Sequence, residues 1–531
     1  MKSPTRKRTD ISEHIKRITN NMRKYFRRCF AALALLAAFA TQAQVQLDYE
    51  ASFTANAGGG DFAPHYMAAN RGGTLTQSRS ALVQAALWHT MDTTRRLSYG
   101  FGAEVWGGYT SGTDYLRYSA TDGMVANRQH PARFWLQQAY AEGKYRGVFL
   151  LLGQKQQQSP FLLNDLTSGD LVMSGNARPG AGFAVGFVNF QNIPFTKGWV
   201  QITGQIGYYK FADGHWLENH YHYLNSFVTT RYWYNYKNIY FRTNPTKPFV
   251  FTIGGQAACQ FGGTVVRYDK GVEQSRLEMA TNAKAFWRAL IAGSGGGNRG
   301  DDFVEGNHVG SWDIIGAYRF RNGNRLRAYY QSPWEDGSGI GKLNGFDGLW
   351  GLEFTTGKPS VVSGVVVEYL DLTNQSGPIH WAPRDHEGTP LTDQATGADD
   401  YYNNYTYNGY QNRGQSIGSP MVKAPIYNQD GYLRYTDNLL RAVHVGIKGD
   451  LGSEWHYRAM VSYRKAWGTP FFPRAEGVHE TSMLVEARYQ PARVPGLEAK
   501  AQFALDRGNM MGDNTGALLS IIYHGNFTLG K

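Results

Sequence analysis

Residues 97–105 read LSYGFGAEV, and this stretch decides the fold class. Its odd-numbered positions carry apolar or aromatic side chains, whereas small or charged residues (Ser98, Gly100, Gly102 and Glu104) lie between them. Strict alternation over nine residues is typical of a β-strand with two unlike faces. The first question is therefore what the apolar face packs against.

The composition answers part of this question. The 531 residues are 14% aromatic and include 63 glycines and 34 tyrosines, yet the mean hydropathy is only −0.45. Similar alternation recurs along the whole chain, and no stretch after residue 45 has the roughly 18 consecutive apolar residues of a transmembrane helix. A transmembrane β-barrel combines low hydropathy with many aromatics, because only every second strand residue faces lipid.

The first 43 residues resemble an export signal. Four basic residues between positions 23 and 28 precede the apolar run CFAALALLAAFA (29–40), and Thr41-Gln42-Ala43 supplies small residues for cleavage after Ala43. We therefore expect residues 1–43 to be a signal peptide, with Met22 a more natural start than Met1. Export followed by a barrel predicts the outer membrane of a Gram-negative bacterium.

The basic character of the chain resides in this leader. Residues 1–43 hold ten Lys or Arg and two Asp or Glu, a net charge of +8, so about +4 of the total +12 remains for residues 44–531. A surplus this small gives no reason to expect nucleic acid as a partner. Only Cys259 lies beyond the leader, so the mature chain has no internal disulfide.

Alternation predicts about eighteen strands in one all-β domain, an antiparallel transmembrane barrel covering 44–531. The expected strands lie near 46–57, 80–90, 95–109, 133–142, 145–154, 180–190, 198–211, 234–242, 247–262, 308–321, 324–332, 347–356, 361–371, 439–449, 454–465, 480–490, 496–505 and 515–529. Short turns alternate with long connections, notably 212–233, 263–307 and 372–438. Outer-membrane barrels have short periplasmic turns and long external loops, so the apolar faces should meet lipid. A soluble sandwich is the alternative.

The opposite strand faces carry many charged side chains, which we expect to line the barrel interior. They could pair with one another across the lumen or form a charge-selective path for permeation. These residues are Glu104, Asp313, Arg319, Arg325, Arg327, Arg458, Arg464, Glu486, Arg488, Glu498 and Lys500.

Several segments resemble blocks of a known family. They are WLQQAYAEGKYRGVFLLLGQK (135–155), LTSGDLVMSGNARP (166–179), KGWVQITGQIGYYKF (197–211), FTIGGQAACQFGG (251–263) and NGYQNRGQSIGSPM (408–421). Together they resemble the Bacteroidetes branch of the capsule assembly family named after the outer-membrane protein Wzi. We take Ser174, Gly175, Asn176, Arg178 and Pro179 as family-motif residues.

The resemblance implies a non-enzymatic surface lectin that helps to attach capsular or extracellular polysaccharide to the cell. It also implies a lumen that is occluded by loops and short helices. The clearest helical pattern lies at 275–293, SRLEMATNAKAFWRALIAG, on an external connection, so this helix would have to fold into the lumen to act as a plug. No cofactor is implied, and the partners are polysaccharide and membrane lipid.

Two short motifs invite a chemical interpretation. The segment 414–418 reads GQSIG, a match to the G-x-S-x-G nucleophile motif, but no strand–turn–helix context surrounds Ser416, so we expect no enzyme. His215, His220 and His222 have metal-like spacing, yet no second acidic or cysteine cluster lies near them, and we assign no metal.

Aromatic, amide-rich loops are the better candidates for binding. Flat rings can cover the apolar face of a sugar, while amides and arginine can bind its hydroxyl and carboxylate groups. Packing between loops is the alternative role for such residues. The candidate carbohydrate-binding residues are Trp216, Tyr221, Tyr223, Tyr401, Tyr402, Tyr405, Tyr407, Tyr410 and Arg413. A diffusion porin remains the alternative function, because porin interiors are also polar and charged.

Overall fold

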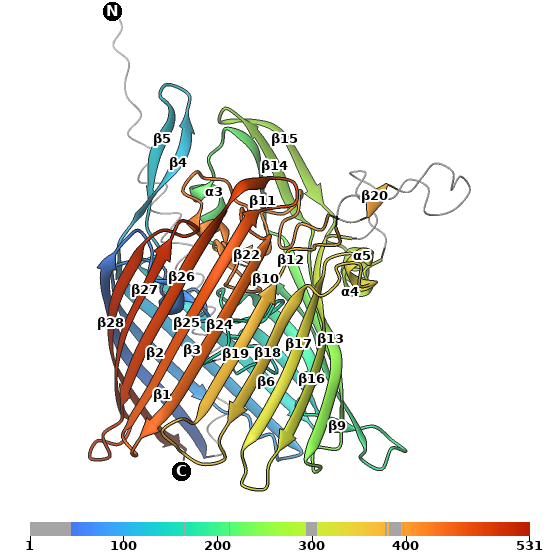
Figure 1. The fold of residues 1–531 in the computed structure, drawn as a ribbon, viewed down its shortest axis with the longest axis vertical. Helices are drawn as coiled ribbons and strands as arrows, with labels where there is room; N and C mark the ends of the chain where they lie inside the picture. Colours follow the sequence, from blue (N-terminus) through green and yellow to red (C-terminus); the bar gives the residue numbers. More distant parts are fainter. Residues whose placement is uncertain are drawn as a thin grey trace, which may run out of the picture.

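The computed structural model describes residues 44–530 except 164, 212, 294–304, 378–379, 382–394 and 397. The expected signal peptide at 1–43 lies outside the described residues. Within the described part, a single antiparallel sheet of eighteen wall strands closes on itself as a barrel (Figure 1). The predicted fold class and strand number are confirmed.

Each wall strand pairs with its neighbours in the sequence, and β1 closes the barrel by pairing with β28. The segments β8 and β9 both pair with β10 and together fill one position of the wall. The wall strands are β1 (Val45–Gly59), β2 (Ser80–His89), β3 (Leu97–Thr110), β6 (Phe134–Tyr145), β7 (Val148–Gln154), β8 (Ala181–Phe187) with β9 (Gln191–Asn192), β10 (Val200–Lys210), β12 (Trp233–Thr243), β13 (Phe249–Phe261), β16 (Asn307–Arg319), β17 (Arg325–Trp334), β18 (Gly348–Thr355), β19 (Gly364–Asp371), β24 (Leu440–Leu451), β25 (Trp455–Gly468), β26 (Pro473–Tyr489), β27 (Leu497–Gly508) and β28 (Asn514–Leu529).

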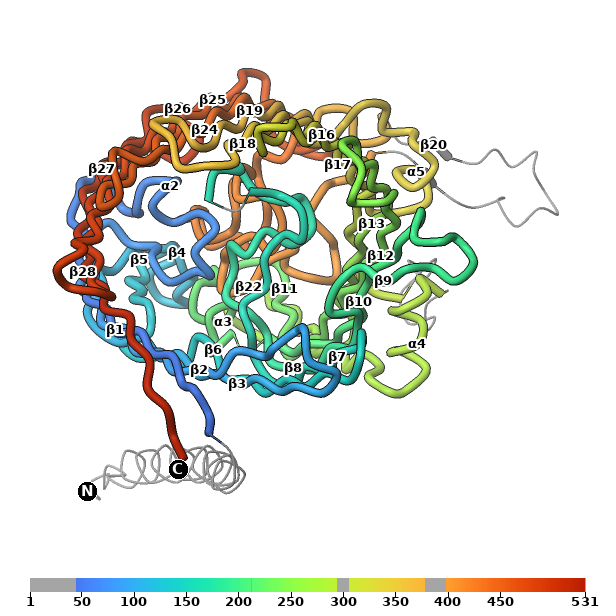
Figure 2. Tube along the Cα trace, turned by 90° about the horizontal axis from the view of Figure 1, so that it is seen from below, coloured from blue at the N-terminus to red at the C-terminus, as the bar shows by residue number. Residues whose placement is uncertain are grey.

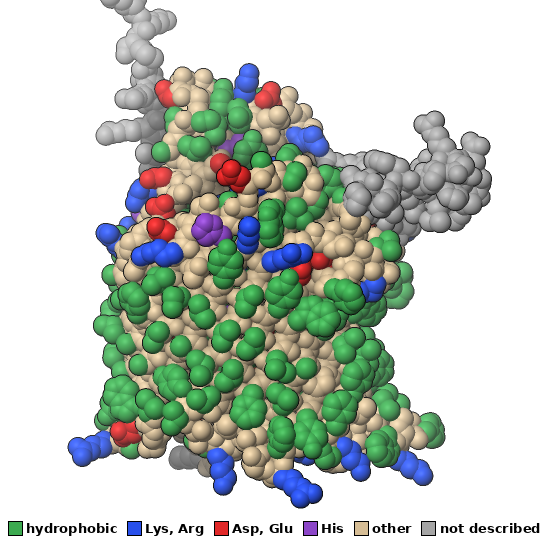
Figure 3. Space-filling model, in the orientation of Figure 1, with side chains coloured by type: hydrophobic (Ala, Val, Ile, Leu, Met, Phe, Trp, Pro, Cys, Tyr) green, Lys and Arg blue, Asp and Glu red, His purple; other side chains and the backbone are tan. Residues whose placement is uncertain are grey.

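The opening stretch LSYGFGAEV lies in β3, and its apolar face points out of the barrel. Leu97 is 72% exposed and Tyr99 is 48% exposed. The same holds around the wall, where the outward side chains form a band of apolar surface bounded by charged residues above and below (Figure 3). Such a band is what a lipid-facing barrel requires. Among the described residues, no helix is long and apolar enough to cross a membrane.

Smaller elements occupy the long connections at one end of the barrel, the external end. They include the hairpin β4 (Thr113–Ser119) and β5 (Gly123–Gln129), and a three-stranded sheet of β11 (Asn225–Thr230), β14 (Gly263–Asp269) and β15 (Val272–Met279). Two-residue pairs join β20 (His380–Trp381) to β21 (Ala395–Thr396) and β22 (Gln411–Asn412) to β23 (Gln415–Ser416). The short helices are α2 (His65–Ala68), α3 (Trp216–His220), α4 (Ala283–Ile291), α5 (Gly337–Ile340) and the 3-10 turn η3 (Pro425–Tyr427).

Three of the connections fold into the lumen. We call the described parts of 60–79, 155–180 and 401–438 the lumen plug; Figure 2 shows these traces inside the ring of wall strands. Leu171, Val172, Tyr402 and Tyr410 of the plug belong to one buried cluster with inward-facing wall residues such as Tyr236. The lumen is therefore filled by a packed core, as expected from the resemblance.

The expected helix at 275–293 needs a correction. Residues 272–279 form β15, and only 283–291 are helical. This helix, α4, does not enter the lumen: it lies outside the ring of strands (Figure 2) and contacts the outer wall at β12 and β13. The short helix inside the lumen is α2, which contacts β26 and β27.

Candidate functional site

Two of the segments that resemble the capsule assembly family bind each other inside the lumen. The Ser174 hydroxyl donates to the Gly418 carbonyl at 2.7 Å, and the Asn176 amide donates to the Ser416 carbonyl at 3.0 Å. In return, the Asn412 amide donates to the Arg178 carbonyl at 2.8 Å. The motif thus joins two plug segments that lie more than 230 residues apart in the sequence.

The remaining motif residues lie beside this contact and bind other parts of the plug and the wall. Gly175 has φ +76°, a conformation that favours glycine, and its carbonyl accepts from the Gly72 amide at 2.9 Å. The Arg178 guanidinium lies 4.8 Å from the ring centre of Trp135. Burial and the nearby Arg413 lower the pKa of Arg178 below its usual range. Arg178 and Pro179 line a small interior cavity together with Gln156, Gln157, Tyr209 and Phe211.

Most of the candidate binding tyrosines are buried, four of them in the plug and Tyr221 directly after α3. The Tyr410 hydroxyl donates to the Val172 carbonyl at 2.8 Å, and the Tyr402 hydroxyl donates to the Leu171 carbonyl at 2.6 Å. Each buried candidate is at most 3% exposed: Tyr221, Tyr401, Tyr402, Tyr407 and Tyr410. These side chains hold loops together, so the packing role that we gave as the alternative describes their structural position.

The other candidates reach the surface to different degrees. Tyr405 is 56% exposed, whereas Tyr223 and Trp216 are half-buried. Trp216 stacks on the His220 ring with centroids 4.1 Å apart. Arg413 is half-buried, and its guanidinium lies against Gly214.

Tyr223 is the centre of a group of aromatic and cationic side chains on the external surface. The Arg117 guanidinium lies 4.8 Å from the Tyr223 ring centre, and the Tyr268 ring meets Tyr223 edge-on at 4.7 Å. Tyr432 contacts the ring of the neighbouring His222 at 4.1 Å, and Arg434 lies 4.9 Å from the Tyr432 ring centre. Tyr432 and Arg434 lie where the third plug segment bonds the external connections, through Gln429 to Leu116 and through Gly431 to His222. We define the external aromatic patch as Arg117, Tyr223, Tyr268, Tyr432 and Arg434.

Backbone hydrogen bonds join the chain segments that carry this patch. The Tyr118 amide donates to the His222 carbonyl at 2.7 Å, the His222 amide donates to the Gly431 carbonyl at 3.1 Å, and the Gly271 amide donates to the Tyr223 carbonyl at 2.8 Å. Four connections that are distant in the sequence are thereby joined. A patch held by main-chain bonds is preorganised for a ligand, because little freedom is lost on binding.

The electrostatics of the patch are simple. Burial lowers the pKa of His222 to about 4, so this imidazole is neutral at physiological pH. Burial also raises the pKa of Tyr223 to about 12, so its hydroxyl remains a hydrogen-bond donor. The charged members are therefore the two arginines, which suit carboxylate or hydroxyl groups of a ligand.

The sequence analysis identified Tyr223 but missed the other four patch residues. A signal was present: four external segments carry an Arg-Tyr pair, at 117–118, 231–232, 267–268 and 434–435, and three of these pairs contain a patch residue. Nothing in the sequence places these segments beside one another, because they belong to different connections.

The histidines and Ser416 occupy unremarkable positions. His215 contacts Glu218, and His222 accepts from the Leu224 amide at 2.7 Å. In the described part of the chain, no three His, Cys, Asp or Glu side chains lie close enough to hold a metal ion. Ser416 is completely buried in β23, within a tight hairpin and without the strand–turn–helix setting of a nucleophile elbow.

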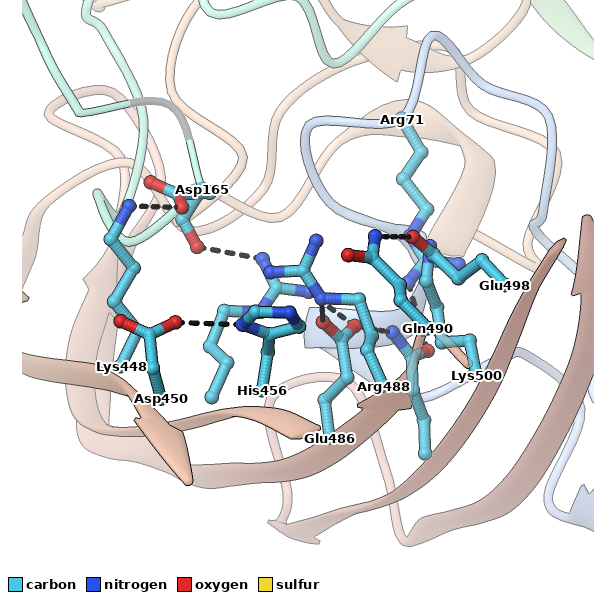
Figure 4. Close-up of polar contacts among 12 residues, drawn as sticks. Arg71, Asp165, Lys448, Asp450, His456, Glu486, Arg488, Gln490, Glu498 and Lys500 are labelled. Atoms are coloured by element: carbon cyan, nitrogen blue, oxygen red, sulfur yellow. Dashed lines mark hydrogen bonds and ion pairs between the residues drawn. The ribbon is translucent and has the colours of Figure 1, made fainter. Parts of the chain in front are cut away.

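Six of the eleven predicted lumen charges form ion pairs, mainly at the periplasmic end: Arg327, Arg458, Glu486, Arg488, Glu498 and Lys500. Glu104, Asp313 and Arg464 instead form hydrogen bonds with neutral groups, and Arg319 and Arg325 are exposed. Arg327 bonds Glu353 at 2.5 Å, and Arg458 bonds Glu486 at 2.8 Å. Figure 4 shows that this second pair belongs to a larger network, in which Asp165 of the plug reaches Lys448 of β24 at 2.6 Å. Arg488 also pairs with Glu486, and Arg71 of the plug reaches Glu486 through Gln502. Two separate groups lie beside this network: Asp450 with His456, and Glu498 with Gln490 and Lys500. The interpretation as paired charges therefore fits the six residues in ion pairs and not the other five.

Comparisons with known proteins give likenesses of fold. No protein-family model and no curated protein sequence matches the chain. Among solved structures, Wzi, an outer-membrane protein involved in group 1 capsule assembly in Escherichia coli and a carbohydrate-binding β-barrel, is similar with 13% identity and a TM-score of 0.49, covering 92% of this chain and 86% of its own.

Two further structures are similar over comparable lengths. OccAB2 of Acinetobacter baumannii is 10% identical with a TM-score of 0.46, covering 92% of this chain and 99% of its own. OccK3 of Pseudomonas aeruginosa is 11% identical with a TM-score of 0.45, covering 92% and 97%. The fold described above rests on the strand pairing and not on these likenesses.

Proposed function

We propose that this protein is a non-enzymatic lectin of the outer membrane that helps to hold capsular or extracellular polysaccharide at the cell surface. The observation that carries the proposal is the external aromatic patch, where aromatic rings and arginines from distant connections meet on the outward end of a plugged barrel. Rings and guanidinium groups together match the two kinds of surface that a sugar presents. The resemblance of the sequence to the Wzi-type capsule assembly family supports the same assignment.

The filled lumen agrees with this proposal. A protein that only binds polysaccharide needs no open path, and the plug occupies the lumen with a packed core. The second candidate is a diffusion porin, which the cluster of charged lumen residues around Glu486 favours. Planar-bilayer recordings distinguish the two: we expect no steady open channel from the purified barrel, whereas a large constant conductance would favour the porin.

Binding of the host's own capsular polysaccharide to the purified barrel tests the proposal directly. Replacing Arg117 and Tyr223 together with alanine should weaken binding about tenfold, because exposed cation–π and stacking contacts are worth roughly 1 kcal/mol or more. The chain offers a matched control at the periplasmic end, where Arg96 lies 5.2 Å from the ring centre of Tyr145. The double variant Arg96→Ala with Tyr145→Ala should bind as the parent does. Equal losses in both variants, or no binding by the parent, would refute the proposal.

A further inference from the structure

The outer face of β12 breaks the apolar pattern of the wall. Its outward positions are Trp233, Asn235, Lys237, Ile239 and Phe241. The amide of Asn235 and the amine of Lys237 thus occupy positions where apolar, lipid-facing side chains are expected. Ile239 is 49% exposed, as a lipid-facing residue should be, but Asn235 is fully buried. A lysine and an asparagine on a lipid-facing wall need a cover, since unpaired polar groups are costly in hydrocarbon.

Helix α4 provides this cover. The Lys237 Nζ donates to the Ala289 carbonyl at the end of the helix at 2.9 Å and to the Asn235 Oδ1 at 2.9 Å. The Tyr208 hydroxyl donates to the Phe286 carbonyl, also at 2.9 Å. Ala285 and Ala289 are buried in one cluster with Tyr208, Cys259 and Phe261 of the wall. These contacts attach α4 firmly to the outside of the barrel.

The far side of α4 is apolar as well. Trp287 is 60% exposed and Ile291 is 53% exposed, and both lie on the side opposite Ala285 and Ala289. A helix that is apolar on both faces is normally buried. Because one face rests on the barrel wall just beyond the lipid-facing Ile206 and Ile239, the other face continues the apolar band of the barrel outward.

Cationic side chains flank this exposed face. Lys284 is exposed and lies one turn before Trp287 and Arg288 on the helix. Lys210, at the external end of β10, lies 5.4 Å from the ring centre of Trp233, which packs on Phe286. Arg288 is already paired with Glu305 at 3.6 Å. Among the described residues, Lys284 and Lys210 are the cations beside this face that form no ion pair.

From this arrangement we infer that α4 is a docking site for a phosphorylated glycolipid of the outer leaflet. Its acyl chains lie against Trp287 and Ile291, and its phosphate groups meet Lys284 and Lys210. The helix thus covers the polar side chains of the wall and presents a binding surface for one kind of lipid in their place. This inference needs an outer-membrane barrel but no saccharide at the external aromatic patch, so the two proposals stand or fall separately.

Native mass spectrometry of the full barrel in detergent tests the inference, with bis-phosphorylated lipid A and its monophosphorylated form as probes. We expect the parent to retain bis-phosphorylated lipid A at least fivefold better than the monophosphorylated form. The variant Trp287→Ala with Ile291→Ala should lose about tenfold in retention, and Lys284→Ala should abolish the preference between the two probes. Folding is checked in each variant by heat-modifiable migration in gels.

The matched control removes lipid-facing side chains elsewhere on the wall. Val485 on β26 and Phe503 on β27 are 58% and 53% exposed, and these strands lie across the ring from α4 (Figure 2). The variant Val485→Ala with Phe503→Ala should retain lipid A as the parent does. An equal loss in this control, or equal retention of both probes by the parent, would overturn the inference. Dimers that disappear when Trp287 and Ile291 are replaced would also overturn it, because the face would then bind a second copy of the chain.

Discussion

Asp170 should be the main attachment of the plug segment 155–180, and its replacement gives the sharpest test of the plug. Its carboxylate is completely buried and accepts hydrogen bonds from its own segment and from two wall strands. The donors are the Ser159 hydroxyl (2.7 Å), the Val172 and Met173 amides (2.8 and 3.0 Å), and the side-chain amides of Gln256 on β13 (2.9 Å) and Gln331 on β17 (2.8 Å).

The magnitude follows from this set of partners. A hydrogen bond to a charged group contributes roughly 1.5–3 kcal/mol, but bonds in one network do not add. Replacing Asp170 leaves these buried donors without their acceptor, at about 1–3 kcal/mol for each donor that stays unsatisfied, so we take about 3–5 kcal/mol for the set. The variant Asp170→Ala should therefore raise the fraction of molecules with a displaced plug by roughly a hundredfold to several thousandfold.

Planar-bilayer conductance and limited proteolysis measure this displacement. We expect Asp170→Ala to show frequent channel openings and cleavage within 155–180, while the barrel itself stays folded in heat-modifiability gels. Asp165→Ala is the control from the same segment: its carboxylate is 38% exposed and pairs with Lys448, so about 1 kcal/mol or less is lost. If Asp170→Ala is as silent and as resistant to protease as the parent, the reasoning is refuted.

Three further outcomes are expected. Tyr410→Ala should lower the free energy of unfolding by about 3–5 kcal/mol, whereas Tyr405→Ala should change it by less than about 0.5 kcal/mol; similar urea midpoints for the two would contradict their assigned burial. Burial and a neighbouring aspartate raise the pKa of Asp399 in an external loop to about 7, so stability should fall as the pH rises from about 4 towards 7. Asp399→Asn should flatten this dependence of stability on pH in urea titrations. An unchanged dependence would show that Asp399 does not cause it. A Cβ on Gly58 would lie 1.8 Å from the Thr515 carbonyl oxygen, so Gly58→Ala should reduce the folded fraction in refolding assays; normal yields would show that the β1–β28 pairing can shift.

The wall of this barrel was predictable from the sequence because alternation is a local property. Each predicted strand overlaps an observed one, since a strand with one lipid face must repeat every second residue whatever its partners are. The external strands β4, β5, β11, β14 and β15 were not predicted, because they lie within long connections whose two faces carry no such constraint.

Local sequence patterns could not predict where the connections lie in space. Tyr410 and Tyr405 lie five residues apart in one aromatic segment, yet one is fully buried and the other is 56% exposed. Composition does not say whether a loop folds into the lumen or projects from it. For α4 the informative signal lay in another element: Asn235 and Lys237, polar on the lipid side of their strand, already required a cover.

The pairing of the first wall strand with the last has a consequence for how the molecule is made. Val45 pairs with Leu529, and Thr54 bonds Ser520 across a separation of 466 residues, so the ring remains open until the final segment of the chain has been delivered. Contacts this distant in the sequence form slowly. Two plug segments come from about the first third of the chain and one from the last third, and they contact one another inside the ring. The loops have the freest access to the lumen while the ring is open, so we expect them to fold inward before or during the last pairing step.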